Sequence, residues 1–175
     1  MAFDGTANRL GALALAVGDR MQEAAAGQAG HSDSAAAALS ALVHILDRPS
    51  VDHLRRLLGL TSSGTVRLLD RLQEHGYIKR VPGRDGRETA ITLTAAGRRA
   101  AGRVTKARAQ VLEEALAPLS AGERETLDAA LSKILVGLMR EPGAVRWTCR
   151  LCDTHACGRY VGGCPVGNAA RERYG

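Results

Sequence analysis

The apolar residues of this chain recur with helical spacing almost throughout, and the spacing changes to strict alternation in a single stretch. Apolar side chains three or four residues apart mark long helical segments at residues 6–26, 34–47 and ~95–117 and in the segment before Pro142. Within residues 88–94, Ile91 and Leu93 alternate with threonines, as in a half-buried strand. Aromatic residues make up only 3% of the chain, so the core must consist mainly of Ala, Leu, Val and Ile. We therefore expect a mainly α-helical fold with one small β-hairpin.

Two short helices joined by a tight turn are predicted in the middle of the chain. Residues 50–60 form the first, with Ser50 as its N-cap and Gly59 as its end. Pro49 is expected to end the preceding helix, because the residue before a proline leaves helical backbone space. The second helix starts near residue 62 and closes on Gly76, with a buried face formed by Val66, Leu68, Leu69 and Leu72. This order is a helix-turn-helix pattern.

A hairpin and two more helices follow. Strands at 77–81 and 88–94 flank the sequence P-G-R-D-G-R, which is typical of a turn. The helix over residues ~95–117 is interrupted at Pro118. Ser120 and Glu123 then predict a capping box at the start of the last long helix. The hairpin therefore lies directly after the helix-turn-helix, where a wing would be.

Positive charge is concentrated beside this motif. The formal net charge is +6, and residues 79–108 alone hold nine Lys or Arg against two acids. Such a stretch can follow the phosphates along one face of a duplex, although residues 98–108 could equally be a solvated helical face. The balance favours a polyanionic partner, and no apolar run is long enough to cross a membrane.

The candidate DNA-contacting residues lie in the second helix and in the wing. A recognition helix enters the major groove with its N-terminal residues leading, and an arginine on a narrow hairpin tip suits the minor groove. Asp85 is expected to fix Arg87 or Arg80 by a charge-assisted hydrogen bond. One of the two serines can instead be the helix cap. The candidates are Ser62, Ser63, Thr65, Arg67, Arg71, Arg84, Asp85 and Arg87.

The stretches L-L-D-R-L-Q-E-H-G-Y-I-K-R and G-R-D-G-R-E-T-A-I-T-L-T-A-A-G-R resemble the MarR family of winged-helix regulators. The family pattern falls on Leu72, Gln73 and Gly76, on Asp85 and Arg87, and on Leu93, Thr94 and Gly97. Gln73 stands where the family usually has Glu. The resemblance covers roughly residues 6–140.

The resemblance implies a homodimeric transcriptional regulator that binds double-stranded DNA at a pseudo-palindromic operator, usually as a repressor. Its first and last long helices would form the dimer interface. The resulting division of the chain is an N-terminal dimerisation helix at 1–33, a winged helix-turn-helix at 34–97, C-terminal dimerisation helices at 98–141 and a cysteine-rich tail at 142–175.

Four cysteines lie close together in this tail, and the first 148 residues have none. Cys149, Cys152, Cys157 and Cys164 follow the spacing C-x2-C-x4-C-x6-C, which the MarR resemblance does not supply. Four thiolates match one tetrahedral Zn²⁺ or one [2Fe–2S] cluster. Unequal short gaps and the final Cys164–Pro165 favour the iron–sulfur cluster, with zinc and a metal-free reversible disulfide as the alternatives.

The interpretation from sequence is a cytoplasmic DNA-binding regulator whose operator binding depends on a redox- or metal-sensitive cysteine site. If the site holds structural zinc, the signal would be a small molecule bound between the dimer helices and the DNA-binding lobe. A thiol redox protein is a further alternative. It is disfavoured because the C-x2-C follows no βαβ pattern and no catalytic Ser, His and Asp arrangement is recognisable. A docking protein with a vestigial helix-turn-helix is the last alternative. No enzymatic activity is expected.

Overall fold

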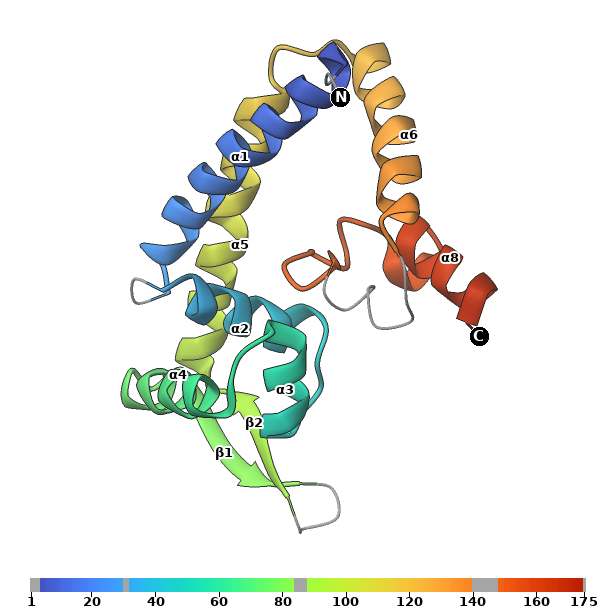
Figure 1. The fold of residues 1–175 in the computed structure, drawn as a ribbon. Helices are drawn as coiled ribbons and strands as arrows, with labels where there is room; N and C mark the ends of the chain where they lie inside the picture. Colours follow the sequence, from blue (N-terminus) through green and yellow to red (C-terminus); the bar gives the residue numbers. More distant parts are fainter. Residues whose placement is uncertain (1–3, 30–31, 84–87, 140–147, 175) are drawn as a thin grey trace.

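The computed structural model describes residues 4–29, 32–83, 88–139 and 148–174, and within them the chain is helical apart from one hairpin. This agrees with the predicted fold class. The elements, drawn in Figure 1, are α1 (Gly5–Ala26), α2 (Asp33–His44), α3 (Val51–Leu58), α4 (Ser62–Glu74), β1 (Ile78–Pro82), β2 (Thr89–Leu93), α5 (Ala95–Leu116), α6 (Ala121–Gly137), the 3-10 turn η1 (Arg159–Val161) and α8 (Pro165–Tyr174).

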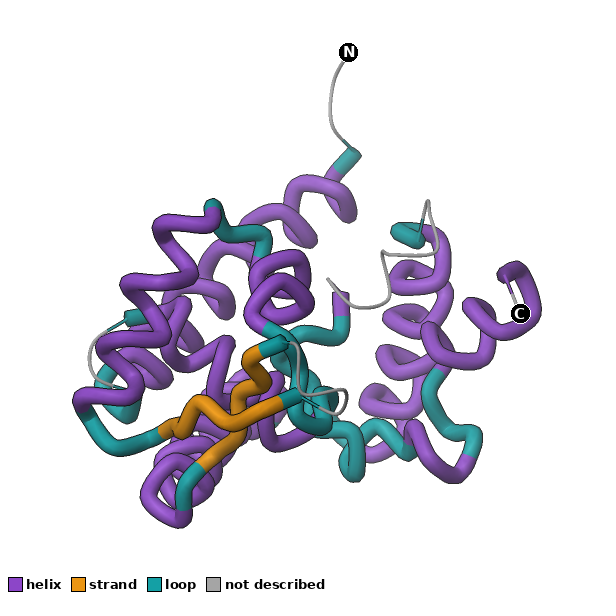
Figure 2. The backbone as a smooth tube through the Cα atoms, turned by 90° about the horizontal axis from the view of Figure 1, so that it is seen from below, coloured by secondary structure: helices purple, strands orange, loops and turns teal. Residues whose placement is uncertain are grey.

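The long helices α1 and α5 pack against each other, and α2, α3, α4 and the hairpin form a lobe at one end of this pair. Seen from below in Figure 2, the two strands lie across the underside of that lobe. The strands are antiparallel, with Ile78 opposite Leu93 and Pro82 opposite Thr89. Helices α6 and α8 pack on each other on the other side of the molecule. The lobe therefore carries the predicted helix-turn-helix and wing.

Several helix boundaries lie where the sequence places them. The Ser50 side chain accepts a hydrogen bond from the backbone N–H of His53 at the start of α3, and Gly59 ends that helix with a φ of 65°. Ser120 and Glu123 form the predicted capping box of α6. These signals are local, which is why one sequence suffices to find them.

Helix α2 ends earlier than predicted. Its last residue is His44, whereas the sequence pattern extends to residue 47. Arg48 has a φ of 47°, outside the right-handed helical region, and Pro49 follows it. The turn brings Pro49 against the hairpin, where its carbonyl accepts from the backbone N–H of Ile91 at 2.9 Å. Because α2 ends at His44, the residues that follow it can turn and hydrogen-bond to strand β2.

The core lies between α2, α3, α4, the hairpin and the first half of α5. Its fully buried side chains include Leu39, Leu54, Leu69, Ile91 and Val104. The expected buried face of α4 was partly wrong. Val66 is 48% exposed, and Thr65 takes the buried position instead. Residues 65, 68, 69 and 72 form the inward stripe, with the spacing of three, four and seven of one helical face.

The wing is joined to α5 by a close backbone contact. The Thr94 hydroxyl caps α5 by accepting from the backbone N–H of Gly97 and donates to the carbonyl of Gly76 at 2.6 Å. A Cβ on Gly97 would lie 1.9 Å from the carbonyl oxygen of Tyr77. The Leu-Thr-x-x-Gly motif therefore has a physical cause, because the threonine caps the helix and the glycine admits the neighbouring backbone.

Among the described helices, none combines the length and the apolar composition that crossing a bilayer requires.

Candidate functional site

The N-terminus of α4 is exposed. Thr61 is the N-cap, and its hydroxyl accepts from the backbone N–H of Gly64 at 3.1 Å. The idea that Ser62 or Ser63 caps this helix was therefore wrong. Both serines lie in the exposed first turn of α4, where their hydroxyls can reach a ligand outside the protein.

Thr65 cannot be a DNA contact in this conformation. Its side chain is fully buried, and its hydroxyl donates to the carbonyl of Thr61 at 2.9 Å. A threonine one turn into a helix commonly bonds the carbonyl four residues earlier. Thr65 therefore supports the start of α4 from inside.

The two arginines of α4 share a face with one of the serines. Ser63, Arg67 and Arg71 are spaced by four residues, which places them on one side of the helix, and all three are exposed. The Arg71 Nε donates to the carbonyl of Arg67 at 3.3 Å. This face combines hydroxyl and guanidinium donors, the groups that bind phosphates and base edges. The wing candidates Arg84, Asp85 and Arg87 lie outside the described residues.

Arg80 of β1 is held by the recognition helix. Its guanidinium donates to the Asp70 carboxylate at 2.6 Å and to the Gln73 side-chain oxygen at 2.7 Å. The predicted bond from Asp85 to Arg87 or Arg80 lies outside the described residues, and within them Arg80 has these two partners from α4. Gln73, which departs from the family pattern, keeps an acceptor at this position. The pairing ties the wing to the recognition helix.

The basic stretch 79–108 is not one continuous DNA-facing surface. Arg98 donates to the carbonyl of Leu93, and Arg108 lies about three turns further along α5. The Arg108 guanidinium is largely buried and donates to the carbonyl of Leu151 in the cysteine tail. Burial lowers the pKa of Arg108. Arg108 therefore binds the cysteine tail inside the molecule and is not part of an exposed basic surface.

The four cysteine side chains lie together, as the sequence predicted. Cys149 and Cys164 belong to one buried apolar cluster, and Cys152 and Cys157 pack against it. Cys149 and Cys164 are buried, Cys152 and Cys157 are half-buried, and all four are free thiols. The backbone N–H of Gly167 donates to the Cys164 sulfur at 3.3 Å. The tail therefore gathers four sulfur ligands in one place.

The thiols differ in acidity. The hydrogen bond donated by Cys149, with the positive charges of Arg108 and Arg159, outweighs burial and lowers the pKa of Cys152 to about 6. The same hydrogen bond, burial and the neighbouring sulfurs raise the pKa of Cys149. Burial raises the pKa of Cys157 as well. Of these three thiols, Cys152 is therefore the most readily ionised.

The thiols are close together, yet they are not arranged around a central point. In the part of the chain that the structure describes, no set of three or more Cys, His, Asp or Glu side chains already has a metal-binding arrangement. The donor set fits zinc or an iron–sulfur cluster in type and number. Side-chain rotation would be needed to complete either site.

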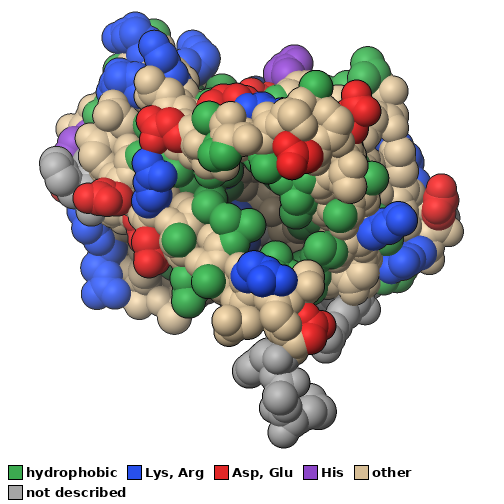
Figure 3. Space-filling view, turned by 90° about the horizontal axis from the view of Figure 1, so that it is seen from above, with side chains coloured by type: hydrophobic (Ala, Val, Ile, Leu, Met, Phe, Trp, Pro, Cys, Tyr) green, Lys and Arg blue, Asp and Glu red, His purple; other side chains and the backbone are tan. Residues whose placement is uncertain are grey.

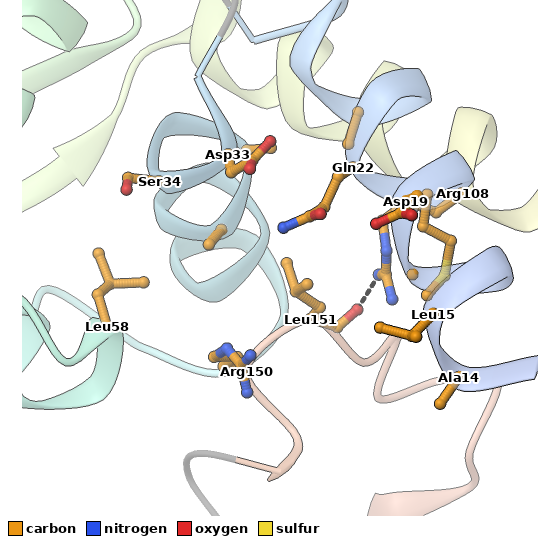
Figure 4. A pocket seen from close by; sticks show the side chains of 15 residues that line it. Ala14, Leu15, Asp19, Gln22, Asp33, Ser34, Leu58, Arg108, Arg150 and Leu151 are labelled. Atoms are coloured by element: carbon orange, nitrogen blue, oxygen red, sulfur yellow. Dashed lines mark hydrogen bonds between the residues drawn. The ribbon is translucent and has the colours of Figure 1, made fainter. Parts of the chain in front are cut away.

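A cavity of about 470 Å³ lies between α1, α2, α3 and the cysteine tail. Most of its wall is apolar, and its polar side chains come from several elements: Asp19 and Gln22 from α1, Asp33 and Ser34 from α2, Arg108 from α5 and Arg150 from the tail. Figure 4 shows the Arg108 guanidinium bonded to the tail at the carbonyl of Leu151. This volume is in the usual range for small-molecule sites. Its location agrees with the effector site proposed from sequence, but no sequence signal identified the tail as one of its walls.

The long helices leave apolar side chains uncovered. Leucines of α1 (Leu10, Leu13 and Leu15) are 43–70% exposed, and α6 has no buried side chain at all. Ile134 and Leu138 of the α6 segment are 40% and 60% exposed. Seen from above in Figure 3, apolar side chains surround a hollow in this face, and charged side chains lie around it. An apolar face of this kind is typical of an interface.

Comparison with known proteins agrees with this geometry. Residues 30–88 match the model of the MarR family, which ends before α5 and the cysteine tail. No curated protein sequence matches the chain. The solved structures, in contrast, resemble most of it.

Three solved structures illustrate the likeness. A probable transcriptional regulator from Pseudomonas aeruginosa is 28% identical, with a TM-score of 0.53, covering 71% of this chain and 95% of its own. RV1404 from Mycobacterium tuberculosis is 24% identical, with a TM-score of 0.63 and coverages of 76% and 93%. A point mutant of MepR from Staphylococcus aureus, bound to an oligodeoxyribonucleotide, is 20% identical, with a TM-score of 0.57 and coverages of 79% and 100%. The chain therefore has the winged helix-turn-helix fold of MarR family transcriptional regulators.

Proposed function

We propose that this protein is a transcriptional regulator that binds double-stranded DNA as a homodimer, as a repressor. The observation that carries the proposal is the exposed face of Ser63, Arg67 and Arg71 on α4, together with Ser62 at the start of the helix. The helix lies next to the hairpin and is fixed to it through Arg80. This is the arrangement in which a recognition helix enters the major groove while a wing reaches the neighbouring groove.

The dimer is supported by the uncovered apolar side chains of α1 and α6. A second copy of the chain would bury them, since a helix with an exposed apolar face gains free energy on association. Two-fold symmetry then sets two α4 helices about one turn of DNA apart and requires a pseudo-palindromic site. The related MepR structure is bound to an oligodeoxyribonucleotide.

The direct test is a mobility-shift assay with the protein's own promoter region at two salt concentrations. Arg67→Ala should weaken specific binding by roughly 1–3 kcal/mol, and binding should fall steeply with salt. Arg87→Ala in the wing should also lose specific binding. The matched control is Arg9→Ala, which removes the same charge from the opposite end of the molecule, at the start of α1. Equal losses in Arg67→Ala and Arg9→Ala would count against a specific role of α4.

We also propose that the four cysteines form a redox- or metal-sensitive site that modulates operator binding. Four thiols in contact and the nearby cations Arg108 and Arg159 support this, because a four-thiolate site is anionic. From the ligand spacing, a [2Fe–2S] cluster is the first assignment, with zinc as the alternative. A reversible disulfide without metal is the third.

Visible absorption and element-resolved metal analysis of protein purified without oxygen separate these assignments. A coloured sample with two irons per chain fits the cluster, whereas a colourless sample with one zinc per chain excludes it. If the sample contains neither iron nor zinc and loses its free thiols on oxidation, the reversible disulfide is the remaining assignment. A redox protein without DNA-binding activity would be revealed by the mobility-shift assay.

The cavity supports an additional effector. Its largely apolar wall, with polar side chains such as Asp19, Asp33 and Arg108, suits a small organic molecule that carries polar groups. Ala14→Trp, at the exposed rim of the cavity, should fill it and abolish the response of DNA binding to any effector. DNA binding without effector should stay unchanged in this variant, and a retained response would place the effector elsewhere.

A further inference from the structure

The segment between the second and third cysteines is docked on the end of α2. Thr154 is buried, and its hydroxyl donates to the carbonyl of His44 at 3.0 Å. The Tyr160 hydroxyl donates to the same carbonyl at 3.3 Å. His44 is the last residue of α2, and the last carbonyls of a helix have no partner within the helix. We call these two hydrogen bonds the α2 latch.

The latch is reinforced by the side chain of His44. Its Nε2 lies 3.0 Å from the Thr105 hydroxyl of α5, and its Nδ1 lies 3.7 Å from the Asp153 carboxylate in the tail. Asp153 in turn accepts from the backbone N–H groups of His155 and Ala156. His44 therefore joins α2, α5 and the cysteine loop at one point.

The other side of the tail is fixed to α6. Cys149, Cys164, Val166 and Ala169 pack with Met139 in a small apolar cluster. Arg173 of α8 donates to the carbonyls of Val136 and Met139 at 3.4 and 3.5 Å. As Figure 1 shows, the tail extends from α6 and α8 back toward the lobe that carries α4 and the wing. It is a bridge between the helix proposed for dimerisation and the DNA-binding lobe.

The two latch residues lie between the cysteines in the sequence, so the positions of the sulfur atoms constrain them. Thr154 is two residues after Cys152 and three before Cys157, and its carbonyl accepts from the Cys157 thiol at 3.6 Å. Tyr160 lies between Cys157 and Cys164. A change in the distances among the sulfurs therefore moves both hydroxyl donors.

We propose that occupation of the four-thiol site by a metal ion sets the α2 latch and thereby fixes the DNA-binding lobe relative to α6. The proposal rests on the proposed function, since it assigns the route by which the cysteine site controls DNA binding. Each ligand thiol that is still protonated releases its proton to solvent when it bonds to the metal. Loss of the ion loosens the loop, frees the carbonyl of His44 and changes operator affinity.

The experiment compares Zn²⁺-loaded dimer with chelator-stripped, reduced dimer. Zn²⁺ is the probe because a tetrahedral ion needs all four thiols. The latch variant is Thr154→Val with Tyr160→Phe, which removes both hydroxyls and keeps the side-chain shapes. The control is Thr126→Val with Tyr174→Phe, the same two changes in α6 and α8.

Affinity for promoter DNA is measured by fluorescence anisotropy, and bound zinc by element analysis. Wild type and control should each bind one zinc per chain and change DNA affinity by about tenfold between the two states, in the range typical of allosteric coupling. The latch variant should bind zinc equally well, with a change below about twofold. An undiminished change in the latch variant, no change in the wild type, or no zinc bound by the wild type overturns the proposal.

Hydrogen exchange separates this proposal from the proposed function. Zinc should slow amide exchange at the end of α2, where Ile45 and Leu46 donate to the carbonyl of Ala41, in the wild type but not in the latch variant. If zinc slows exchange at the end of α2 but the protein binds no DNA in either state, the latch proposal stands and the proposed function is wrong. If zinc does not change exchange at the end of α2, the latch proposal is wrong, whatever the DNA-binding result.

Discussion

The winged-helix lobe and the cysteine tail are stabilised in different ways. The lobe has one apolar cluster of 20 buried residues drawn from α1 to α5, and its helices start and end at local capping signals. The tail has a cluster of five, two of which are cysteines. Its turn around η1 is set by Gly158 and Gly162 in the left-handed conformation. A core this small rarely stabilises a segment alone, so the tail depends on contacts with α6 and α2 or on a bound metal.

The largest expected effect is in the lobe, at Gly97. Gly97→Ala places a Cβ 1.9 Å from the carbonyl oxygen of Tyr77 and should destabilise the protein by about 3 kcal/mol or more, because backbone must move. Gly102→Ala is the control, since it lies in the same helix with no atom within 4 Å of its added Cβ. The free energy of unfolding of Gly102→Ala should increase by about 0.5–1 kcal/mol, because alanine is more stable than glycine within a helix. Urea unfolding measures both, and equal stabilities would refute the close contact.

Core truncations should separate the two regions. Leu54→Ala in the lobe should lower the free energy of unfolding by about 2–5 kcal/mol in a single transition. Val166→Ala in the tail, also buried, should leave that transition nearly unchanged and increase the rate of proteolysis between the cysteines. If Val166→Ala shifts the main transition as much as Leu54→Ala, the tail and the lobe unfold as one unit.

A smaller effect distinguishes the cap of α4 from its ligand-facing serine. Thr61→Ala removes the hydroxyl that accepts from the backbone N–H of Gly64 and should cost about 1 kcal/mol of stability. Ser62→Ala should leave stability within about 0.5 kcal/mol and weaken DNA binding instead. Thermal unfolding and anisotropy on the same two variants give the comparison. A larger loss of stability in Ser62→Ala than in Thr61→Ala would indicate that Ser62, and not Thr61, is the N-cap of α4.

The smallest effect is expected at the pair that fixes the wing. Arg80→Met breaks the bonds to Asp70 and Gln73, and about 1 kcal/mol or less should be lost because the pair is partly exposed to solvent. Chemical unfolding gives that difference. Arg99→Met, an exposed change on α5, is the control. No difference between the two would mean that the Arg80 pair contributes nothing to stability.

Element order and most boundaries from α1 to α6 could be predicted because their causes are local, whereas helix α8 in the tail was not predicted. Helical spacing, the Ser50 and Ser120 caps and the turn residues of the hairpin each act within a few positions. Thr65 was misplaced because neighbouring Val66 looks apolar by composition, and only the neighbouring helices decide which of the two faces inward. Thr61 was missed because Thr61, Ser62 and Ser63 are all good caps.

Long-range contacts could not be predicted in the same way. Arg108 looked like part of a phosphate-binding stripe, but its partner Leu151 is 43 residues away in the sequence. The contact between Thr154 and His44 spans 110 residues. Cysteine spacing predicted that the thiols meet, since they are close in sequence, but it contained no information about the surface on which they dock.

Helix α5 begins under the wing at Thr94 and passes beside the cysteine tail at Arg108, without a break in between. Fourteen residues of helix span roughly 21 Å, so a tilt of about 5° at one point displaces the other by roughly 2 Å. A rigid rod of this kind acts as a lever. If the proposed function holds, a displacement at the sulfur atoms that tilts α5 by this angle would move the Thr94 end of the helix, under the wing, by roughly 2 Å.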